Sequence, residues 1–359
     1  MPIFPDDLVP KFLQGMNIHT GWFPYIHGIC VDNQGKPLVF YVSVNFTLGG
    51  PKFSFIIQGR TYAGNFDKSA HSYTNGVLTI GTKPRLEIDY HHPHRIRIDI
   101  NPSMSIRLEI TYRGPPLWYS KSTNPADMVA FTPTSFIGGY DVPCRINGEI
   151  SSPTKSMSFS GYGDYGNVWL LGSLKWKETK SRWLVFNDSH SYGIAVKSYD
   201  ARTGSLLAST GRIGTEDGST LTFDDFEWVD DNLQPPRYVR IRGSIRDLSG
   251  MIIGKASIET AQSVSLFVPW MWTQHKMTGS IDARNFEGSA WCETRRPLEA
   301  STSACIMIMA RSGFLTARMA GLYQRFSPKL TETLRKHETL RSVAGTAFES
   351  ITGLLRLIP

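Results

Sequence analysis

The chain has 359 residues, of which 41% are hydrophobic and 19% charged, so it is long enough for two domains with real cores and lacks the composition of a disordered tail or a coiled coil. The formal net charge is +7, and residues 297–359 contribute much of it, with eight Arg or Lys against four Glu. The rest of the sequence shows no dense basic segment with stacking aromatics, so we expect no nucleic acid partner. Four cysteines, Cys30, Cys144, Cys292 and Cys305, never form a C-x-x-C pair, which argues against a zinc module, an iron–sulfur site or a disulfide scaffold.

The first residues, Met1 to Pro10, contain Asp6 and Asp7 and lack both a basic start and an apolar run. No secretory signal is visible, so we expect a cytoplasmic protein with reduced thiols. The longest apolar stretch, near residues 304–310, is too short to cross a bilayer. We therefore expect no integral membrane span.

From residue 21 to about residue 293 the sequence consists of short alternating segments between turn residues. Leu38 to Val44 follows a turn at Asp32–Gly35, and residues 95–100 and 105–110 alternate strictly between apolar and polar side chains. A period of two predicts strands whose inner side lines a core or a cavity. Turn residues recur about every 8–12 residues, which is typical of an all-β barrel or sandwich.

The second half of this region repeats the pattern. Further strands are predicted at residues 183–186, 193–198, 220–223, 238–245 and 251–259, with hairpin turns at 200–204 and 247–250. Gly, Ser and Pro concentrate between residues 138 and 165, which we take as a junction. The sequence therefore predicts two similar antiparallel β domains, 1–150 and 151–296.

At residue 297 the composition changes abruptly. All nine Trp precede this point, Ser327 and Pro328 form a plausible helix start, and apolar residues then recur at helical spacing. We expect an amphipathic, basic α-helical tail over 297–359. Two roles are equally favoured: peripheral contact with an anionic membrane surface, or packing on the barrels or at a homodimer interface.

Motifs for bound cofactors are missing from the sequence. It contains no Gly-rich phosphate loop, no G-x-S-x-G and no H-E-x-x-H, so we expect no NAD, ATP, flavin or other cofactor. The cluster His91-His92-Pro93-His94 is interpreted as a solvated turn rather than a metal site, because strand neighbours face opposite ways and Pro93 bends the chain. No metal site is predicted.

Asp164 is the first candidate for a catalytic acid. It lies among glycines and aromatics in Gly161 to Trp169, where a carboxyl in an apolar pocket would have a raised pKa and could donate a proton. The structural alternative is a β-bulge or a linker between barrels, with Asp164 capping a turn.

Three further residues are weaker candidates. Asp188 and His190 are two residues apart and would share one side of a continued strand, although a polar hairpin is the favoured interpretation of this segment. Glu227 precedes Trp228 and is an alternative acid. Trp228 and Trp272 belong to an aromatic inventory larger than a small core needs, which favours an apolar, aromatic-lined cavity able to stabilise a carbocation.

Four segments give the chain a family resemblance. They are Gly21–Gly28 with the following hairpin, Gly148–Ile150 leading to Gly161–Trp169, Trp183 with Tyr192–Tyr199, and Phe286–Glu293. Their order and spacing over residues 21–293 resemble the carotenoid 1,2-hydratase and AttH-like superfamily. That superfamily is built from two lipocalin-like barrels and includes fungal decalin-forming pericyclases.

The resemblance implies two tandem lipocalin-like β-barrels with a pocket between or inside them, acting on a hydrophobic small molecule without a cofactor. We expect a hydratase, cyclase or isomerase of an isoprenoid or polyene, with Asp164 as the acid and Asp188, His190 or Glu227 as alternatives. The alternative function is a carrier that binds a lipid or isoprenoid without altering it. The side chains expected to shape the pocket are Trp22, Tyr25, Tyr165, Trp169, Trp183, Trp228 and Trp272.

Overall fold

The computed structural model describes residues 20–47, 50–57, 60–66, 71–82, 84–91, 93–101, 104–120, 127–172, 179–187, 191–215, 218–231, 238–247, 249–266, 272–281 and 284–295. Within these ranges the chain is all-β and contains no helix, as the alternating sequence pattern predicts. Consequently, no helix in the described part is long and apolar enough to cross a membrane. The predicted helical tail, 297–359, lies outside the described residues.

The first sheet has thirteen strands, eleven of which follow the order β4-β3-β2-β1-β13-β12-β9-β8-β7-β6-β5, while β10 and β11 pair with β12. Its strands are β1 (Thr20–Asp32), β2 (Pro37–Thr47), β3 (Gly50–Ile57), β4 (Arg60–Asn65), β5 (His71–Thr74), β6 (Val77–Ile80), β7 (Arg85–Asp89), β8 (His94–Asn101), β9 (Met104–Tyr112), β10 (Leu117–Trp118), β11 (Val129–Thr132), β12 (Ser135–Ser152) and β13 (Lys155–Gly172).

The second sheet has nine strands in the order β17-β16-β15-β14-β22-β21-β20-β19-β18, and a further pairing of β17 with β19 closes eight of them into a barrel. Its strands are β14 (Thr179–Asn187), β15 (Ser191–Asp200), β16 (Leu206–Thr215), β17 (Thr220–Thr222), β18 (Glu227–Asp230), β19 (Tyr238–Arg246), β20 (Ile252–Leu266), β21 (Trp272–Ile281) and β22 (Arg284–Arg295).

The chain passes from the first sheet to the second after Gly172, not at the boundary expected at residue 150. That boundary falls inside the long β12–β13 hairpin, which is paired from Ser135↔Gly172 to Ser152↔Lys155. The glycines of this region reflect close packing rather than a linker. A Cβ at Gly148, for example, would overlap the ring of Phe159 on the neighbouring strand.

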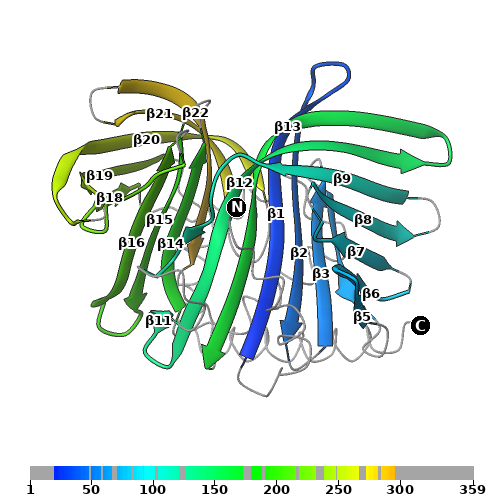
Figure 1. Cartoon of the computed structure of the whole chain (residues 1–359), viewed down its shortest axis with the longest axis horizontal. Coiled ribbons are helices and arrows are strands. Elements are labelled where there is room, and N and C mark those ends of the chain that lie inside the picture. Colours follow the sequence, from blue (N-terminus) through cyan, green and yellow to red (C-terminus); the bar gives the residue numbers. More distant parts are fainter. Residues whose placement is uncertain are drawn as a thin grey trace, which may run out of the picture.

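The two faces of the first sheet have different partners. One face forms the sheet's own core, with Ile26, Leu38, Ile98 and Ile146 among its fully buried members. The opposite face of β1, β2, β12 and β13 packs on β14, β15 and β22 of the second sheet, and Figure 1 shows the two sheets meeting there. This shared apolar layer, which we call the inter-sheet layer, contains Tyr41, Leu117, Tyr119, Phe131, Ile137, Val168, Leu170, Trp183, Val185, Tyr192, Ile194, Val196 and Trp291.

Hydrogen bonds between the sheets reinforce the inter-sheet layer. The Tyr192 hydroxyl donates to the carbonyl of Pro115 at 3.1 Å, and the Thr210 hydroxyl donates to the carbonyl of Tyr119 at 2.9 Å. Because these bonds cross an apolar boundary, they fix how one sheet is placed on the other. A site built in this layer therefore draws on both halves of the chain.

Candidate functional site

The site is built on three adjacent strands, β1, β13 and β12, whose alternation points one set of side chains into the inter-sheet layer. His27 pairs with Asp164, and Asp164 pairs with Pro143, so that the strand register sets residues from distant parts of the chain side by side. Three successive rows of cross-strand neighbours form this surface: Tyr25–Gly166–Asp141, His27–Asp164–Pro143 and Ile29–Tyr162–Arg145.

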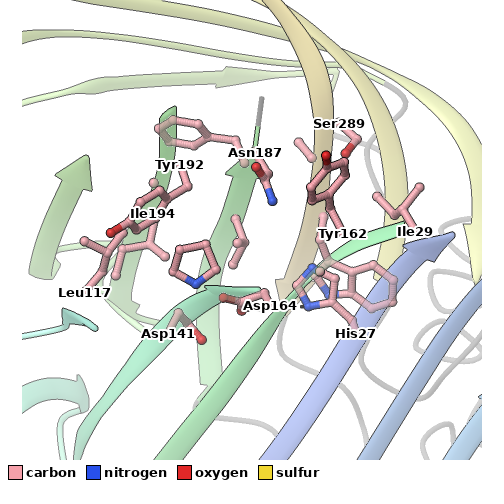
Figure 2. A pocket seen from close by; sticks show the side chains of 17 residues that line it. His27, Ile29, Leu117, Asp141, Tyr162, Asp164, Asn187, Tyr192, Ile194 and Ser289 are labelled. Atoms are coloured by element: carbon pink, nitrogen blue, oxygen red, sulfur yellow. Dashed lines mark ion pairs between the residues drawn. The ribbon is translucent and has the colours of Figure 1, made fainter. Parts of the chain in front are cut away.

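The second sheet supplies the opposite wall of a narrow cleft. Its lining residues include Val185 and Asn187 of β14, Tyr192 and Ile194 of β15, and Trp291 of β22. Figure 2 shows Asp141, Asp164 and His27 reaching into this space from the first sheet. The cavity volume is about 20 Å³, which is room for about one water molecule.

Two carboxyls, Asp141 and Asp164, are the central groups of the cleft. Their exposed fractions are 1% and 3%, so both are removed from water. Burial, with repulsion from Asp141, raises the pKa of Asp164 well above its usual range. Burial also raises the pKa of Asp141, but hydrogen bonds donated to it limit that pKa to about 6. The two carboxyls therefore differ in proton affinity, and Asp164 is the one whose environment more strongly favours the protonated form.

Tyr25 stabilises the ionised form of Asp141. Its hydroxyl donates a hydrogen bond to Asp141 Oδ1 from the far side of β13. The intervening residue is Gly166, where a Cβ would overlap the Tyr25 ring, so only glycine lets the phenol reach across the strand. Burial and the Asp141 charge raise the pKa of Tyr25 well above its usual value, which keeps the hydroxyl protonated as a donor.

His27 is the third polar group. Burial lowers its pKa to about 3, so the imidazole is neutral at physiological pH. The Trp291 ring stacks on it with centroids 4.5 Å apart, which fixes the imidazole plane. Nδ1 lies 3.8 Å from Asp164 Oδ2, and since the imidazole is neutral, this contact is not an ion pair.

Three atoms of these side chains have no hydrogen-bond partner in the described part of the protein. They are His27 Nδ1, Asp141 Oδ2 and Asp164 Oδ2, each fully buried. A buried polar atom without a partner costs about 1–3 kcal/mol, so the three together favour a polar ligand group at this point. The arrangement can donate a proton from Asp164, accept one at Asp141, and orient a small polar group beside His27.

Some sequence-predicted residues meet in or beside this cleft. Asp164 and Tyr25 belong to its first two rows. Trp183 lies in the adjoining inter-sheet layer, where its ring packs against Tyr119 with centroids 4.7 Å apart and its Nε1 is buried without a partner.

Other predicted residues lie elsewhere. Tyr165 points into the first sheet's own core, Trp169 packs with Tyr140, and Trp228 lies in the core of the second barrel. Strand alternation explains this, because Tyr165 and Trp169 face away from Asp164 on the same strand. Glu227 is exposed at the start of β18 and does not line the cleft.

Four predicted residues have no described side chain. Trp22 and Trp272 lie in β1 and β21, but their side chains are outside the description. Asp188 and His190 lie outside the described residues altogether. Their roles stay predictions.

The histidine cluster divides at Pro93. His91 is exposed and hydrogen bonds to Asp89, in agreement with a solvated turn. His94 is instead the first residue of β8, is 2% exposed and hydrogen bonds to the Tyr112 hydroxyl, so the predicted turn ends before it. No group of three or more His, Cys, Asp or Glu in the described ranges could hold a metal ion.

Three residues of the site, Asp141, His27 and Trp291, are not predicted by the sequence. Asp141 follows Gly138-Gly139-Tyr140, the same glycine–aromatic setting that singled out Asp164, so one signal was available for it. His27 and Trp291 have no such local signal. They reach the site only through the pairing of β1 with β13 and the packing of β22.

Comparisons with known proteins place the fold. No protein-family model matches the chain. No curated protein matches it significantly in sequence. Among solved structures, an AttH-type protein from Nitrosomonas europaea is similar at a TM-score of 0.58 and 14% identity, over 82% of this chain and 97% of that one.

Two more solved structures are similar. CghA in complex with Sch210972 gives a TM-score of 0.55 at 9% identity, over 77% of this chain and 88% of that one. Kievitone hydratase from Nectria haematococca gives a TM-score of 0.49 at 8% identity, over 77% of this chain and 89% of that one. The AttH and CghA similarities show that the chain shares the fold of these two proteins, as the sequence resemblance predicts.

Proposed function

We propose that this protein is a cofactor-independent hydratase, cyclase or isomerase that transfers a proton to a hydrophobic isoprenoid or polyene in the cleft between its two sheets. One observation carries the proposal: Asp141 and Asp164 are buried side by side, and their surroundings raise both pKa values, with Tyr25 donating a hydrogen bond to Asp141 alone. Pairs of carboxyls with separated proton affinities are a usual basis of acid–base catalysis. The shared fold with CghA, a decalin-forming pericyclase, supports an enzyme.

The chemistry begins at Asp164, whose proton goes to one carbon of a double bond and leaves a carbocation at the other. The cation is then quenched in one of two ways. Loss of a neighbouring C–H proton to the Asp141 carboxylate gives an isomer or a cyclised product, whereas addition of water with its proton passing to Asp141 gives an alcohol. In either case Asp141 ends protonated, and proton exchange within the pair restores Asp164.

The size of the cleft sets a requirement for this proposal. A volume of about 20 Å³ admits a single small group, so a polyene reaches Asp164 only when the walls move apart. Tyr162 lines the cleft and is 44% exposed, so rotation of its side chain is one movement that would widen the space.

The test is turnover in deuterated water. The purified protein is incubated with a panel of linear isoprenoids and conjugated polyenes, and products are analysed by liquid chromatography and mass spectrometry. Hydration adds the elements of D₂O, whereas isomerisation or cyclisation exchanges one hydrogen for deuterium. Asp164→Asn should lower turnover by about 10²–10⁴-fold, since the proton donor is lost while the fold keeps an isosteric side chain.

Glu227→Gln serves as the matched control, because Glu227 is exposed and outside the cleft. That variant should retain full turnover. Wild-type turnover in Asp164→Asn would remove Asp164 from the mechanism. A ligand that co-purifies with the wild type and is never converted would instead establish the carrier function.

A further inference from the structure

Two guanidinium groups stand at the opening of the cleft. The Cζ atoms of Arg113 and Arg145 lie 4.9 Å and 5.9 Å from the ring centroid of Tyr162, which lines the cleft. Arg113 also donates to Asn187 Oδ1 at 2.5 Å, and Asn187 belongs to the opposite wall. Both positive charges are therefore held at the opening, and one of them spans the two sheets.

The strand register fixes where this basic opening lies relative to the carboxyl pair. Arg145 is the cross-strand partner of Tyr162, and Tyr162 is two residues from Asp164 on the same face of β13. Two residues of an extended strand cover ~7 Å. The guanidinium groups thus lie one row away from the proton donor, beside the exposed ring of Tyr162.

Both guanidinium groups contact the ring of Tyr162. A cation–π contact at an exposed ring is worth only about 0.5–1 kcal/mol, so the ring alone holds neither group strongly. Arg145 forms no ion pair with any carboxylate in the described part of the chain. The planar guanidinium fork matches a carboxylate, so an anionic ligand group at this position would give Arg145 a partner.

We propose that the cleft takes a polyene or isoprenoid that carries a carboxylate, with the carboxylate held by Arg113 and Arg145 and the reacting double bond ~7 Å further in, beside Asp164. The proposal deepens the proposed function and rests on it for the apolar part of the ligand. It orients the chain with its acidic end outward, so a single double bond is presented to the proton donor.

The experiment compares two fluorescent probes that differ only in charge, cis-parinaric acid and its methyl ester, titrated into the full-length protein at pH 7.5. The wild type should bind the acid about 10–100-fold more tightly, the worth of hydrogen bonds to a charged group. Arg145→Gln should cost the acid about tenfold and leave ester affinity unchanged. Arg97→Gln, at an exposed arginine of β8 that does not line the cleft, is the matched control and should change neither affinity.

Arg113→Gln should act like Arg145→Gln, but it also removes the hydrogen bond to Asn187, so thermal unfolding is measured on both variants. Three outcomes would each overturn the proposal. They are wild-type binding of acid and ester with equal affinity, equal weakening of both by Arg145→Gln, and binding of neither probe. Asp164→Asn should bind the acid like the wild type. If the acid preference holds but no polyene acid is turned over, the proposed reaction fails and the carboxylate site stands.

Discussion

At the residue scale, burial of the carboxyl pair lowers the stability of the folded protein while it shifts the pKa values that acid–base chemistry needs. An ionisable group whose pKa is raised in the folded state binds protons more tightly there than in the unfolded chain. It contributes stability below its unfolded pKa and loses that contribution as pH rises through the folded pKa. For Asp141 this contribution to stability is lost between pH 3.8 and about pH 6, so at neutral pH the buried carboxylate destabilises the fold.

Asp141→Asn should therefore stabilise the folded protein above pH 6. The predicted gain is about 3 kcal/mol, which follows from the difference between 3.8 and about 6 in pKa. The amide oxygen can still accept the Tyr25 hydrogen bond, so little packing is lost. Urea unfolding followed at pH 4 and pH 8 measures the effect, and turnover should be lost in the same variant because the proton acceptor is gone.

The control for this prediction is Asp200→Asn in the β15–β16 hairpin. The backbone N–H of Arg202 holds the pKa of Asp200 below its usual range, so any contribution of its charge to stability grows as pH rises. As pH rises, the unfolding free energy of Asp141→Asn should thus increase relative to wild type, whereas that of Asp200→Asn should decrease relative to wild type. A gain in Asp141→Asn that is the same at pH 4 and pH 8 would contradict the assignment of a raised pKa to Asp141.

At the element scale, Gly166 is the position on which the geometry of the site depends most. Gly166→Ala should force the Tyr25 ring aside and break its bond to Asp141, which raises the pKa of Asp141 further and lowers turnover. We expect a loss of about 1–3 kcal/mol in unfolding free energy from overpacking. Chemical denaturation together with the deuterium assay measures both effects.

A double-mutant cycle separates this clash from a general intolerance of alanine on β13. In a Tyr25→Ala background the space beside Gly166 is open, so adding Gly166→Ala should cost much less than in the wild type. Additive losses in the two backgrounds would show that the Tyr25 contact is not what requires glycine at position 166.

The sequence predicts the strands of this protein well but not how they pair. Strict alternation in residues 95–100 and 105–110 appears as β8 and β9, with Ile96, Ile98, Ile106 and Leu108 buried. The glycine-rich stretch between residues 138 and 165 was interpreted as a junction because glycine marks both turns and close strand packing. Only the register of β12 with β13 distinguishes the two, and register is a long-range property.

The candidate site was only partly predictable for the same reason. Asp164 has a local signal, a carboxyl among glycines and aromatics, and the structure buries it as that signal suggests. His27 lies 137 positions away in sequence and becomes its neighbour through strand pairing alone. No local pattern in residues 21–28 indicates that pairing, so the acid could be proposed from sequence but not its surroundings.

At the scale of the whole molecule, the aromatic residues are divided among several cores rather than lining one cavity. Trp228 belongs to the second barrel, Trp169 to a small cluster with Tyr140, and Trp183 and Trp291 to the inter-sheet layer. Composition reports how many indoles there are, whereas strand alternation decides which layer each one enters. The layer between the sheets, not the interior of either one, is where aromatic and acidic groups meet.

This layer should make the two sheets depend on each other. Trp291 comes from β22 of the second sheet, yet its ring stacks on His27 and on Tyr41 of the first, with centroids 4.5 Å and 5.8 Å away. Trp291→Ala should cost about 3–5 kcal/mol and leave a cavity against β1 and β13. We expect backbone amides of those two strands to exchange with deuterium ~100-fold faster, which mass spectrometry of peptides from the full-length protein can measure.

Trp228→Ala is the matched comparison, since Trp228 is equally large and buried but packs within the second barrel. It should accelerate exchange in β18 and β19 and leave β1 and β13 close to wild type. If Trp291→Ala alters only strands of the second sheet, the inter-sheet layer does not couple the halves, and the carboxyl pair would have to be held by the first sheet alone. If both variants accelerate exchange everywhere, the chain opens as one cooperative unit and no strand-specific coupling can be assigned to Trp291.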